Sequence, residues 1–347
     1  MRLEIDLEEF DFRLPPEQIA QQPPAERDGA RMLVLDRAGG ECHQTRVREL
    51  AAWLQPGDLL VVNATRVLPA RLRGRKASGG GAEALLLAAD ESNPGRFRAL
   101  VKTRGRLRPG LKFAFGPVGD ALEAELIQLA ENGEVVLAFE AGADPYARGE
   151  APLPPYIRRD VAETRDVERY QTAYARVPGS VAAPTAGLHL SERLLEELAA
   201  AGVGRAEVVL HVGPGTFRPL RPVDLEAHRL HAEHFELPQA TADRVAATRA
   251  AGGHIVAVGT TSARVLEACA APGRVVCAAA GETDLFLAPG DRFEVVDALL
   301  SNFHLPRSSL LLLVAAFAGR EAVLAAYAEA VSAGFRFYSY GDAMLIR

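Results

Sequence analysis

The spacing of apolar runs and turn-forming residues changes sharply along this chain, and this change limits the possible folds more than any single motif does. Between residues 66 and 151 the sequence breaks into short β-like runs, with Gly, Pro or Asn at almost every junction. The runs cover residues 70–76, 82–89, 96–101, 112–115, 121–129 and 134–139. Short strands at this spacing predict a small antiparallel barrel.

Outside this segment, longer runs with helical periodicity alternate with strands. Residues 58–63 (DLLVVN) follow a Pro-Gly turn and are typical of a buried strand. Predicted helices and the strands that follow them cover residues 191–201 and 206–211, 241–251 and 254–259, and 262–270 and 275–280. This alternation implies a sheet with helical crossovers. We therefore expect an α/β main domain with a mixed sheet, formed by residues 1–66 and 151–347, that carries an inserted small antiparallel β-barrel at residues 67–150.

The composition excludes several classes of protein. A chain of 347 residues with a net charge of −6 is long enough for roughly two folded domains. The start, MRLEIDLEEFDF, lacks the apolar segment of a signal peptide, and the longest apolar run, residues 310–318, is shorter than the ~20 residues that span a bilayer. That run is expected to be a buried strand or a core helix. The three cysteines form no CxxC pair, so neither a disulfide framework nor a thiolate metal site is indicated. We expect a cytoplasmic protein without membrane contact.

Basic residues gather in the predicted barrel. Residues 66–112 contain twelve Lys or Arg and three acidic residues, so this segment carries +9 while the whole chain carries −6. A basic segment on an acidic protein favours a polyanionic partner such as a nucleic acid. The alternative is that arginine is simply abundant, which would not explain the clustering. The candidate contacts are Arg66, Arg71, Arg73, Arg75, Lys76, Lys102, Arg104 and Arg108.

A loop of small residues, GSVAAPTAGLHL (179–190), precedes a predicted helix for which Ser191 is a plausible N-cap. Small side chains let the backbone approach a ligand closely, and the end of the loop places His189 at the helix entrance. The alternative is a tight buried turn in which the alanines only pack. Ser180, Thr185 and Gly187 are the candidate ligand contacts in this loop.

The segment HIVAVGTTSARVLE (254–267) is a predicted strand, turn and helix. Gly259, Thr260, Thr261 and Ser262 stand where backbone amides and hydroxyls could hold a carboxylate or phosphate. The segment contains neither GxGxxG nor GxxxxGK[ST], so it does not indicate a dinucleotide or P-loop site. The threonines could also be simple helix caps.

The segment HRLHAEH (228–234) brings three histidines and Glu233 together. It is not an HExxH motif, and on a helix the third histidine would turn about 60° beyond the second, so a zinc site is weakly supported. Acid–base or substrate-binding histidines and purely structural ones remain open. His231 and Glu233 share a face only if the segment is extended.

Two further segments carry polar residues near apolar ones. In GETDLFLAPG (281–290), Glu282 and Asp284 could bind a ribose diol or an ammonium group, or cap a turn. In FYSYGDAMLI (337–346), Tyr340 and Asp342 stand among aromatic residues that could stack on a base or pack in the core.

A series of motifs in one order runs through almost the whole chain. It includes FDFRLPPEQIAQQPPAERDGARMLVLDR (10–37), GDLLVVNATRVLPARLRGRK (57–76), PLPPYI (152–157), ERYQTAYA (168–175), GSVAAPTAGLHL (179–190), HVGPGTFRPL (211–220), HRLHAE (228–233), VGTTSARVLE (258–267), GETDLFLAPG (281–290), SNFHLPRSSLL (301–311) and FYSYGDAMLI (337–346). Together these motifs resemble the S-adenosylmethionine:tRNA ribosyltransferase-isomerase family of queuosine biosynthesis.

The resemblance implies an α/β domain with an inserted barrel, and a reaction in which the ribosyl portion of S-adenosylmethionine moves to tRNA. The acceptor is 7-aminomethyl-7-deazaguanine at wobble position 34 of a tRNA with a GUN anticodon. Adenine and methionine leave and epoxyqueuosine remains. The sulfonium acidifies the C5′ hydrogens, so this reaction needs a base, a hydrogen-bond donor for adenine and no metal or other cofactor.

The resemblance also suggests roles for the candidate residues. His189 is expected to perform the acid–base work with a pKa lowered by the helix N-terminus, and His231 and Glu233 are expected to support it. Tyr340 and Asp342 would form the pocket for the modified base, the basic residues of the insert would bind tRNA, and the protein would act as a monomer. The expected S-adenosylmethionine contacts are Ser180, Thr185, Gly187, Thr216, Gly259, Thr260, Thr261, Ser262, Glu282 and Asp284.

Two other functions compete with this interpretation. An RNA methyltransferase would use the same cosubstrate and release S-adenosylhomocysteine. An RNA-binding module would use the α/β part only as a scaffold and release no product. Free adenine together with methionine would distinguish the ribosyl transfer from both.

Overall fold

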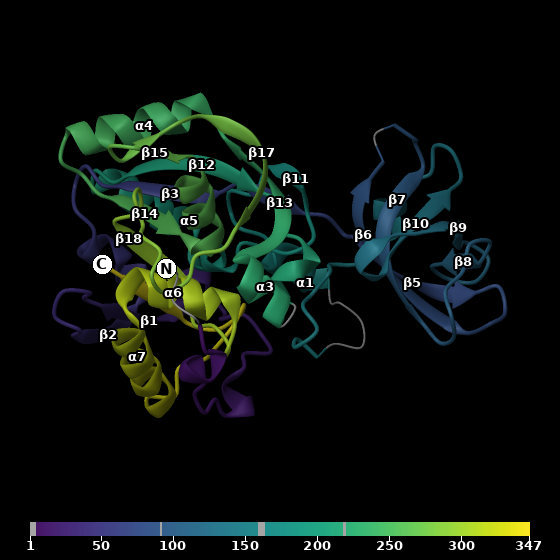
Figure 1. Ribbon diagram of the computed structural model, residues 1–347, viewed down its shortest axis with the longest axis horizontal. Coiled ribbons are helices and arrows are strands. Elements are labelled where there is room, and N and C mark those ends of the chain that lie inside the picture. Colours follow the sequence, from purple (N-terminus) through teal and green to yellow (C-terminus); the bar gives the residue numbers. More distant parts are fainter. Residues whose placement is uncertain (1–4, 91, 159–163, 218–219) are drawn as a thin grey trace.

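The computed structural model describes residues 5–347 except 91, 159–163 and 218–219, together with side chains other than those of residues 132, 164–165 and 216–217. An α/β body contains both ends of the chain, and a barrel projects from one side of it (Figure 1). The expected α/β fold with a mixed sheet and an inserted antiparallel barrel is confirmed.

A nine-stranded mixed sheet forms the centre of the body. Its strands lie in the order β17-β13-β12-β3-β14-β18-β19-β1-β2, and β12, β3, β14 and β18 run parallel to one another. Their bounds are β1 Arg31–Leu35, β2 Cys42–Arg46, β3 Leu59–Asn63, β12 Gly204–Leu210, β13 Arg229–Leu237, β14 Ile255–Val258, β17 Ala279–Leu285, β18 Ala298–Asn302 and β19 Ala343–Ile346.

The sheet is buried on both faces because alternate residues of its central strands enter two different cores. In β3, Leu59 and Val61 belong to one core while Leu60 and Val62 belong to the other. The first core includes residues of α4 to α7, and the second includes α2. The α-helices are α1 Thr164–Arg169, α2 Glu192–Ala200, α3 Pro222–Ala227, α4 Gln239–Ala250, α5 Gly259–Ala268, α6 Ser309–Ala318 and α7 Arg320–Ser332.

The barrel closes in the order β10-β7-β6-β5-β8-β9. Its strands match the predicted runs: β5 Arg71–Lys76, β6 Gly81–Ala89, β7 Arg96–Thr103, β8 Lys112–Phe115, β9 Leu122–Leu129 and β10 Glu134–Phe139. Buried and partly exposed residues alternate along the barrel strands, as in β10, and the buried side chains fill the barrel interior. Gly74 lets β5 approach β8, because a Cβ there would lie 2.1 Å from the Ala114 carbonyl oxygen.

Short elements connect these parts. β4 (Thr65–Val67) pairs with β11 (Val177–Ser180) where the chain enters and leaves the barrel, and β15 (Ala270–Ala271) pairs with β16 (Val275–Val276). The 3-10 helices are η1 Leu7–Phe10, η2 Pro16–Gln18, η3 Arg27–Gly29, η4 Val47–Trp53, η5 Glu131–Gly133, η6 Pro145–Arg148, η7 Thr185–His189 and η8 Pro214–Phe217.

Some local expectations hold and others are wrong. Ser191 caps α2, since its hydroxyl accepts the Leu194 N–H at 3.1 Å. The run at residues 310–318 is helical, in α6, and α5 begins at Gly259 rather than at Ser262. The predicted strand at residues 275–280 is interrupted: Val275 and Val276 form β16, which pairs with β15, and the chain enters β17 at the sheet edge from Ala279 on.

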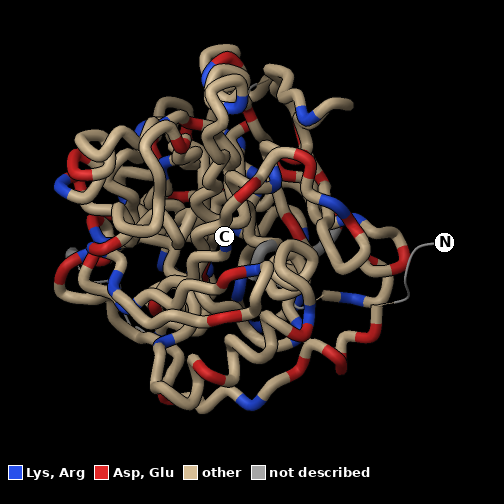
Figure 2. Tube along the Cα trace, turned by 90° about the vertical axis from the view of Figure 1, so that its left-hand side faces the viewer, with Lys and Arg blue, Asp and Glu red and all other residues tan. Residues whose placement is uncertain are grey.

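Charge is interspersed on the end of the body that faces away from the barrel. Figure 2 shows acidic and basic residues mixed along the chain there, with neither sign gathered into one patch. Within the described residues no single helix is long and apolar enough to cross a membrane; α6 and α7 together have the length and composition but are bent by 116°.

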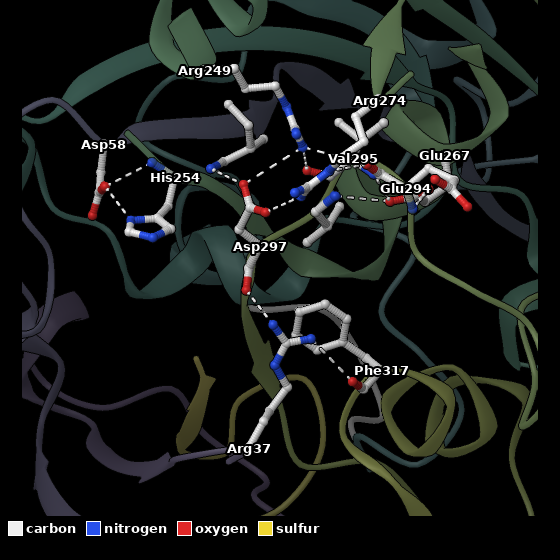
Figure 3. Close-up of polar contacts among 12 residues, drawn as sticks. Arg37, Asp58, Arg249, His254, Glu267, Arg274, Glu294, Val295, Asp297 and Phe317 are labelled. Carbon is white, nitrogen blue, oxygen red and sulfur yellow. Dashed lines mark hydrogen bonds and ion pairs between the residues drawn. The ribbon is translucent and has the colours of Figure 1, made fainter. Parts of the chain in front are cut away.

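A polar network at the amino ends of β14 and β18 holds helices and loops to the sheet (Figure 3). The Asp297 carboxylate accepts the Ile255 N–H at 2.9 Å and pairs with Arg249 and Arg274. Glu267 of α5 accepts three consecutive backbone N–H groups, from residues 294–296, at 2.8–3.0 Å. These bonds satisfy backbone donors of a loop that has no sheet partner.

We predict that Glu267→Leu lowers the free energy of unfolding by roughly 2–4 kcal/mol, because three backbone donors lose their acceptor together. Chemical denaturation monitored by circular dichroism measures this change. Glu321→Leu, at an exposed position of α7, is the matched control and should change stability by less than about 0.5 kcal/mol. Equal unfolding midpoints for the two variants would contradict the prediction.

Candidate functional site

The carboxyl ends of β3, β12, β14 and β18 meet at one edge of the sheet because these strands are parallel. Open α/β sheets bind ligands at this edge. The chain there continues into Thr65, His211 and Gly259, and β18 ends at Asn302. Motifs that lie far apart in the sequence are therefore neighbours.

A first cavity, which we call the inner cavity, opens at this edge. Its empty volume is about 540 Å³ with the open mouth included. Apolar side chains form much of its wall, while hydroxyl, amide and imidazole groups are interspersed. The lining residues are Ala183, Pro184, Thr185, Ala186, Val212, Gly259, Thr260, Thr261, Ser301, Asn302, His304, Leu310, Tyr338 and Ser339.

A second cavity, the middle cavity, adjoins the first and shares Thr260, Thr261 and Leu310 with it. Its empty volume is about 700 Å³, and its other walls carry charged groups. Besides the three shared residues, the lining residues of the middle cavity are Gly215, Leu220, Arg221, Asp224, Leu230, His231, Glu233, Arg264 and Ser309.

A groove between the body and the barrel continues from the middle cavity. It shares Gly215, His231 and Glu233 with that cavity. Residues of the body, including His211, His234 and Glu282, form one side, and residues of the barrel, including Arg98 and Glu134, form the other. The three spaces thus form a series from the sheet edge to the barrel.

The start of α5 forms the wall between the inner and middle cavities. Gly259 has φ +83°, a conformation that glycine adopts without strain where β14 turns into the helix. The first turn of a helix presents unpaired N–H groups and the positive end of its dipole. Thr261 Oγ1 is buried and has no hydrogen-bond partner among the described residues. Ser262 has a structural role instead, since its hydroxyl donates to the Val258 carbonyl at 2.9 Å.

Glu233 and Arg264 form a buried ion pair beside the middle cavity; their side chains are each only 6% exposed. Glu233 Oε1 also accepts the Gly213 N–H at 2.9 Å, and Arg264 donates to the Leu285 carbonyl at 3.0 Å. A buried charge is stable only with partners of this kind, so the pair fixes the carboxylate in place.

From Arg229 on, the segment with three histidines is extended in β13, so His231 and Glu233 face the same side and both line the middle cavity. His234 faces the other way and stacks on His211 at 5.7 Å, while His228 contacts Asp291 at 2.8 Å. The histidines therefore do not converge on a single point. Among the described residues no group of three or more His, Cys, Asp or Glu is arranged to hold a metal ion.

His189 does not line the inner cavity but lies behind its wall. It is 2% exposed, and its Nε2 lies 3.1 Å from Nδ2 of Asn302, which does line the cavity. Burial lowers the pKa of His189 to about 4. The direction agrees with the expectation from sequence, but the main cause is desolvation rather than the helix dipole.

Two residues of the small-residue loop have packing roles. The Ser180 hydroxyl donates to the Ala182 carbonyl at 2.7 Å and accepts the Val212 N–H at 2.8 Å. Gly187 faces Tyr174, whose hydroxyl would lie 2.1 Å from an added Cβ. The close approach that requires glycine is thus made by Tyr174 and not by a ligand in the described cavities, whereas Thr185 lines the inner cavity.

The remaining predicted site residues divide between the groove and the core. Glu282 lines the groove, while Asp284 pairs with Arg229 at 3.3 Å. Tyr340 is buried against Tyr170, and Asp342 accepts the N–H groups of Arg31 and Arg336. These two residues support the turn that places Tyr338 and Ser339 in the inner cavity. The side chain of Thr216 lies outside the described residues.

The basic residues of the predicted tRNA-binding set differ in their ion pairs and in their exposure. Arg71 and Arg73 pair with Glu83 and Glu150 at 3.7 and 3.0 Å, and Arg66 donates to the Ala175 carbonyl. Arg75 and Lys76 are partly exposed in β5. The exposed members of the predicted set in the barrel are Lys102, Arg104 and Arg108.

Sequence reasoning missed several residues that line these spaces: His211, Arg264, Asn302, His304 and Tyr338. Arg264 could have been found, because it stands four residues after Thr260 on the same helix face. In the motif SNFHLPRSSLL, Asn302 ends a buried strand and His304 follows it, where residues at a sheet edge would be expected.

This chain is similar to known proteins along nearly its whole length. A family model described as a queuosine biosynthesis protein matches residues 7–346. An S-adenosylmethionine:tRNA ribosyltransferase-isomerase of Pelobacter propionicus is 48% identical over 345 residues, covering 98% of this chain and 99% of that protein. The protein with the same name from an Anaeromyxobacter species (strain K) is 51% identical over 346 residues, with 98% and 99% covered.

A solved structure leads to the same family. The crystal structure of an S-adenosylmethionine tRNA ribosyltransferase from Thermotoga maritima is 37% identical to this chain and superposes with a TM-score of 0.57, covering 98% of this chain and 100% of that one. With a family model across nearly all residues and relatives near 50% identity over the full length, the chain belongs to the S-adenosylmethionine:tRNA ribosyltransferase-isomerase family of queuosine biosynthesis.

Proposed function

We propose that this protein transfers the ribosyl moiety of S-adenosylmethionine to 7-aminomethyl-7-deazaguanine at position 34 of a tRNA with a GUN anticodon, and isomerises it to give epoxyqueuosine. The full-length family match carries this proposal. The series of two cavities and a groove supports it, because the reaction must bring a small cosubstrate and a macromolecular base to one place.

The chemistry needs a base that removes a C5′ proton next to the sulfonium, and a donor that assists the departure of adenine. The aminomethyl nitrogen then attacks C1′, and a ribose oxygen displaces methionine to close the epoxide. None of these steps requires a metal or a further cofactor.

We assign the proton transfer to His231 and Glu233 rather than to His189. Both residues line the middle cavity, whereas the His189 ring contacts Asn302 behind the wall of the inner cavity. Glu233 is fixed by Arg264 and by the Gly213 N–H, so it is already in position when the cosubstrate binds. Glu233 neutralises the charge of Arg264, so this pair presents no net positive charge to the sulfonium cation.

We place the adenosyl portion against the start of α5 and the small-residue loop, at Thr185, Gly259, Thr260 and Thr261, and the polar end of the cosubstrate toward Glu282 in the groove. Residues 1–66 and 151–347 form the catalytic domain, and residues 67–150 form the domain that contacts tRNA. The protein acts as a monomer in the cytoplasm.

Product analysis tests the reaction itself. Incubation of the protein with S-adenosylmethionine and tRNA carrying the deazaguanine should release free adenine and methionine, which liquid chromatography detects. S-adenosylhomocysteine would instead identify a methyltransferase. Binding of the tRNA with no small-molecule product would identify an RNA-binding module.

We predict that Glu233→Gln slows adenine release in a single turnover by about 10²–10⁴-fold, because the substrate proton loses its acceptor. The assay uses saturating cosubstrate and tRNA, and thermal unfolding checks that the variant folds. Glu236→Gln is the matched control, since Glu236 lies on the same strand but is exposed on its other face. Adenine release within tenfold of wild type in a folded Glu233→Gln protein would contradict the assignment.

We also predict that replacing Lys102, Arg104 and Arg108 together by Ala weakens tRNA binding and flattens its salt dependence, by up to about 0.9 units of slope for each lost phosphate contact. Filter binding between low and high salt measures the slope. These exposed side chains test the barrel more cleanly than Arg71 and Arg73, which form ion pairs.

The control for tRNA binding is the triple replacement of Arg13, Arg48 and Arg292, which are exposed on the body. This variant should keep the wild-type slope. A barrel variant with an unchanged slope would remove the barrel from the tRNA interface.

A further inference from the structure

Asn302 ends β18 and forms part of the wall of the inner cavity, with only 2% of its surface exposed. Its side-chain nitrogen Nδ2 lies 3.1 Å from Nε2 of His189 and 3.1 Å from the backbone carbonyl of Tyr338. An amide nitrogen carries two hydrogens, so both are used.

The orientation of this amide is determined by its partners. The Tyr338 carbonyl can only accept a hydrogen bond, so the NH₂ group and not the oxygen must face it. The oxygen Oδ1 therefore faces elsewhere. Oδ1 is buried and has no hydrogen-bond partner among the described residues. A buried acceptor without a partner is costly, and in a cavity wall it is expected to meet a donor of the ligand.

His189 has a defined role in this arrangement. Because Nδ2 of Asn302 only donates, Nε2 of His189 must accept, and the ring must be neutral. Burial, which lowers the pKa of His189 to about 4, favours this form, and a hydrogen bond to the backbone of Arg27 holds the ring. Two acceptors, His189 and the Tyr338 carbonyl, thus prevent the amide from turning.

The cavity suits a flat heteroaromatic ring. Ala183, Ala186, Val212 and Leu310 provide apolar walls on which such a ring can lie. A ring that also satisfies Oδ1 must carry an N–H donor at its edge. In the proposed reaction two rings have such a group: the 6-amino group of adenine, and the 2-amino group of the deazaguanine in tRNA.

We propose that Asn302 recognises the ring amino group of the nucleobase that enters the inner cavity, by accepting its hydrogen bond at Oδ1, and that His189 is a positioning residue for this amide. The proposal rests on the proposed function, which supplies the two candidate bases. It makes Asn302 a specificity-determining residue.

The first experiment measures coupling between Asn302 and the 6-amino group. Calorimetry compares the binding of S-adenosylmethionine with that of the analogue in which hydrogen replaces the 6-amino group. The wild type should bind the analogue about 10- to 100-fold more weakly, and in Asn302→Leu this ratio should fall to near one. Asn93→Leu, the same substitution on an exposed loop of the barrel, should keep the wild-type ratio.

The second experiment tests the base in tRNA. Anticodon stem-loops that carry the aminomethyl-deazaguanine, with or without its 2-amino group, are compared by their dissociation constants for the same three proteins. A ratio that depends on Asn302 in one experiment supports the proposal and identifies the base. Ratios that are the same in wild type and Asn302→Leu in both experiments would overturn it.

Because both readouts are binding constants, they do not depend on turnover. If the binding ratio depends on Asn302 but no adenine is released, the recognition by Asn302 stands and the proposed reaction is refuted. If adenine is released but the binding ratio does not depend on Asn302, the proposed reaction stands and the role of Asn302 is refuted.

The positioning role of His189 is tested by His189→Gln and His189→Leu. A glutamine oxygen can take the place of the Nε2 acceptor, so His189→Gln should keep the discrimination between amino and deamino ligands within about threefold, while His189→Leu should lower it about tenfold or more. Thermal unfolding checks that both variants are folded. Equal discrimination in the two variants would show that His189 only supports the fold.

Discussion

The parallel pairing of β3 with β12 on one side and β14 on the other brings the functional segments together. Leu59 in β3 pairs with Gly204 in β12 and with Ile255 in β14, so residues that lie far apart in the chain are held at one level of the sheet. Asn63 reinforces this register, since its side chain both donates to the Leu210 carbonyl and accepts the Leu210 N–H. The strands therefore end together, and the segments that follow them form the cavity walls.

Buried polar contacts then determine how these walls are shaped. Glu233 and Arg264 connect β13 with α5, and Ser180 connects the small-residue loop with Val212. Such groups stabilise a fold only when they are paired, so each of them allows a single arrangement of the segments that it joins. The same requirement makes Asn302 Oδ1 conspicuous, because within the described part of the chain it has no partner while the nitrogen of the same amide has two.

The barrel is attached where β4 and β11 lie side by side, which keeps the two connections short. A second contact, between the backbones of Arg71 and Glu150, closes its base, and the ion pair of Arg73 with Glu150 strengthens it. An insertion whose ends are adjacent disturbs its host little, so the barrel can extend the binding surface without altering the sheet. Part of its arginine content serves this attachment, and the rest remains exposed.

The barrel strands, the α/β alternation, the cap at Ser191 and the family could all be predicted from the sequence, because they depend on local periodicity, turn residues and motif order. Which polar residues line a cavity and which lie behind its wall depends on contacts between segments that are distant in the chain. Gly187 meets Tyr174, Tyr340 lies against Tyr170, and His189 stands behind Asn302, a residue 113 positions away in the chain. Residues that line a cavity and residues that lie directly behind its wall occur in the same kinds of motif, since both need a defined backbone and a polar partner. Only long-range packing distinguishes the two.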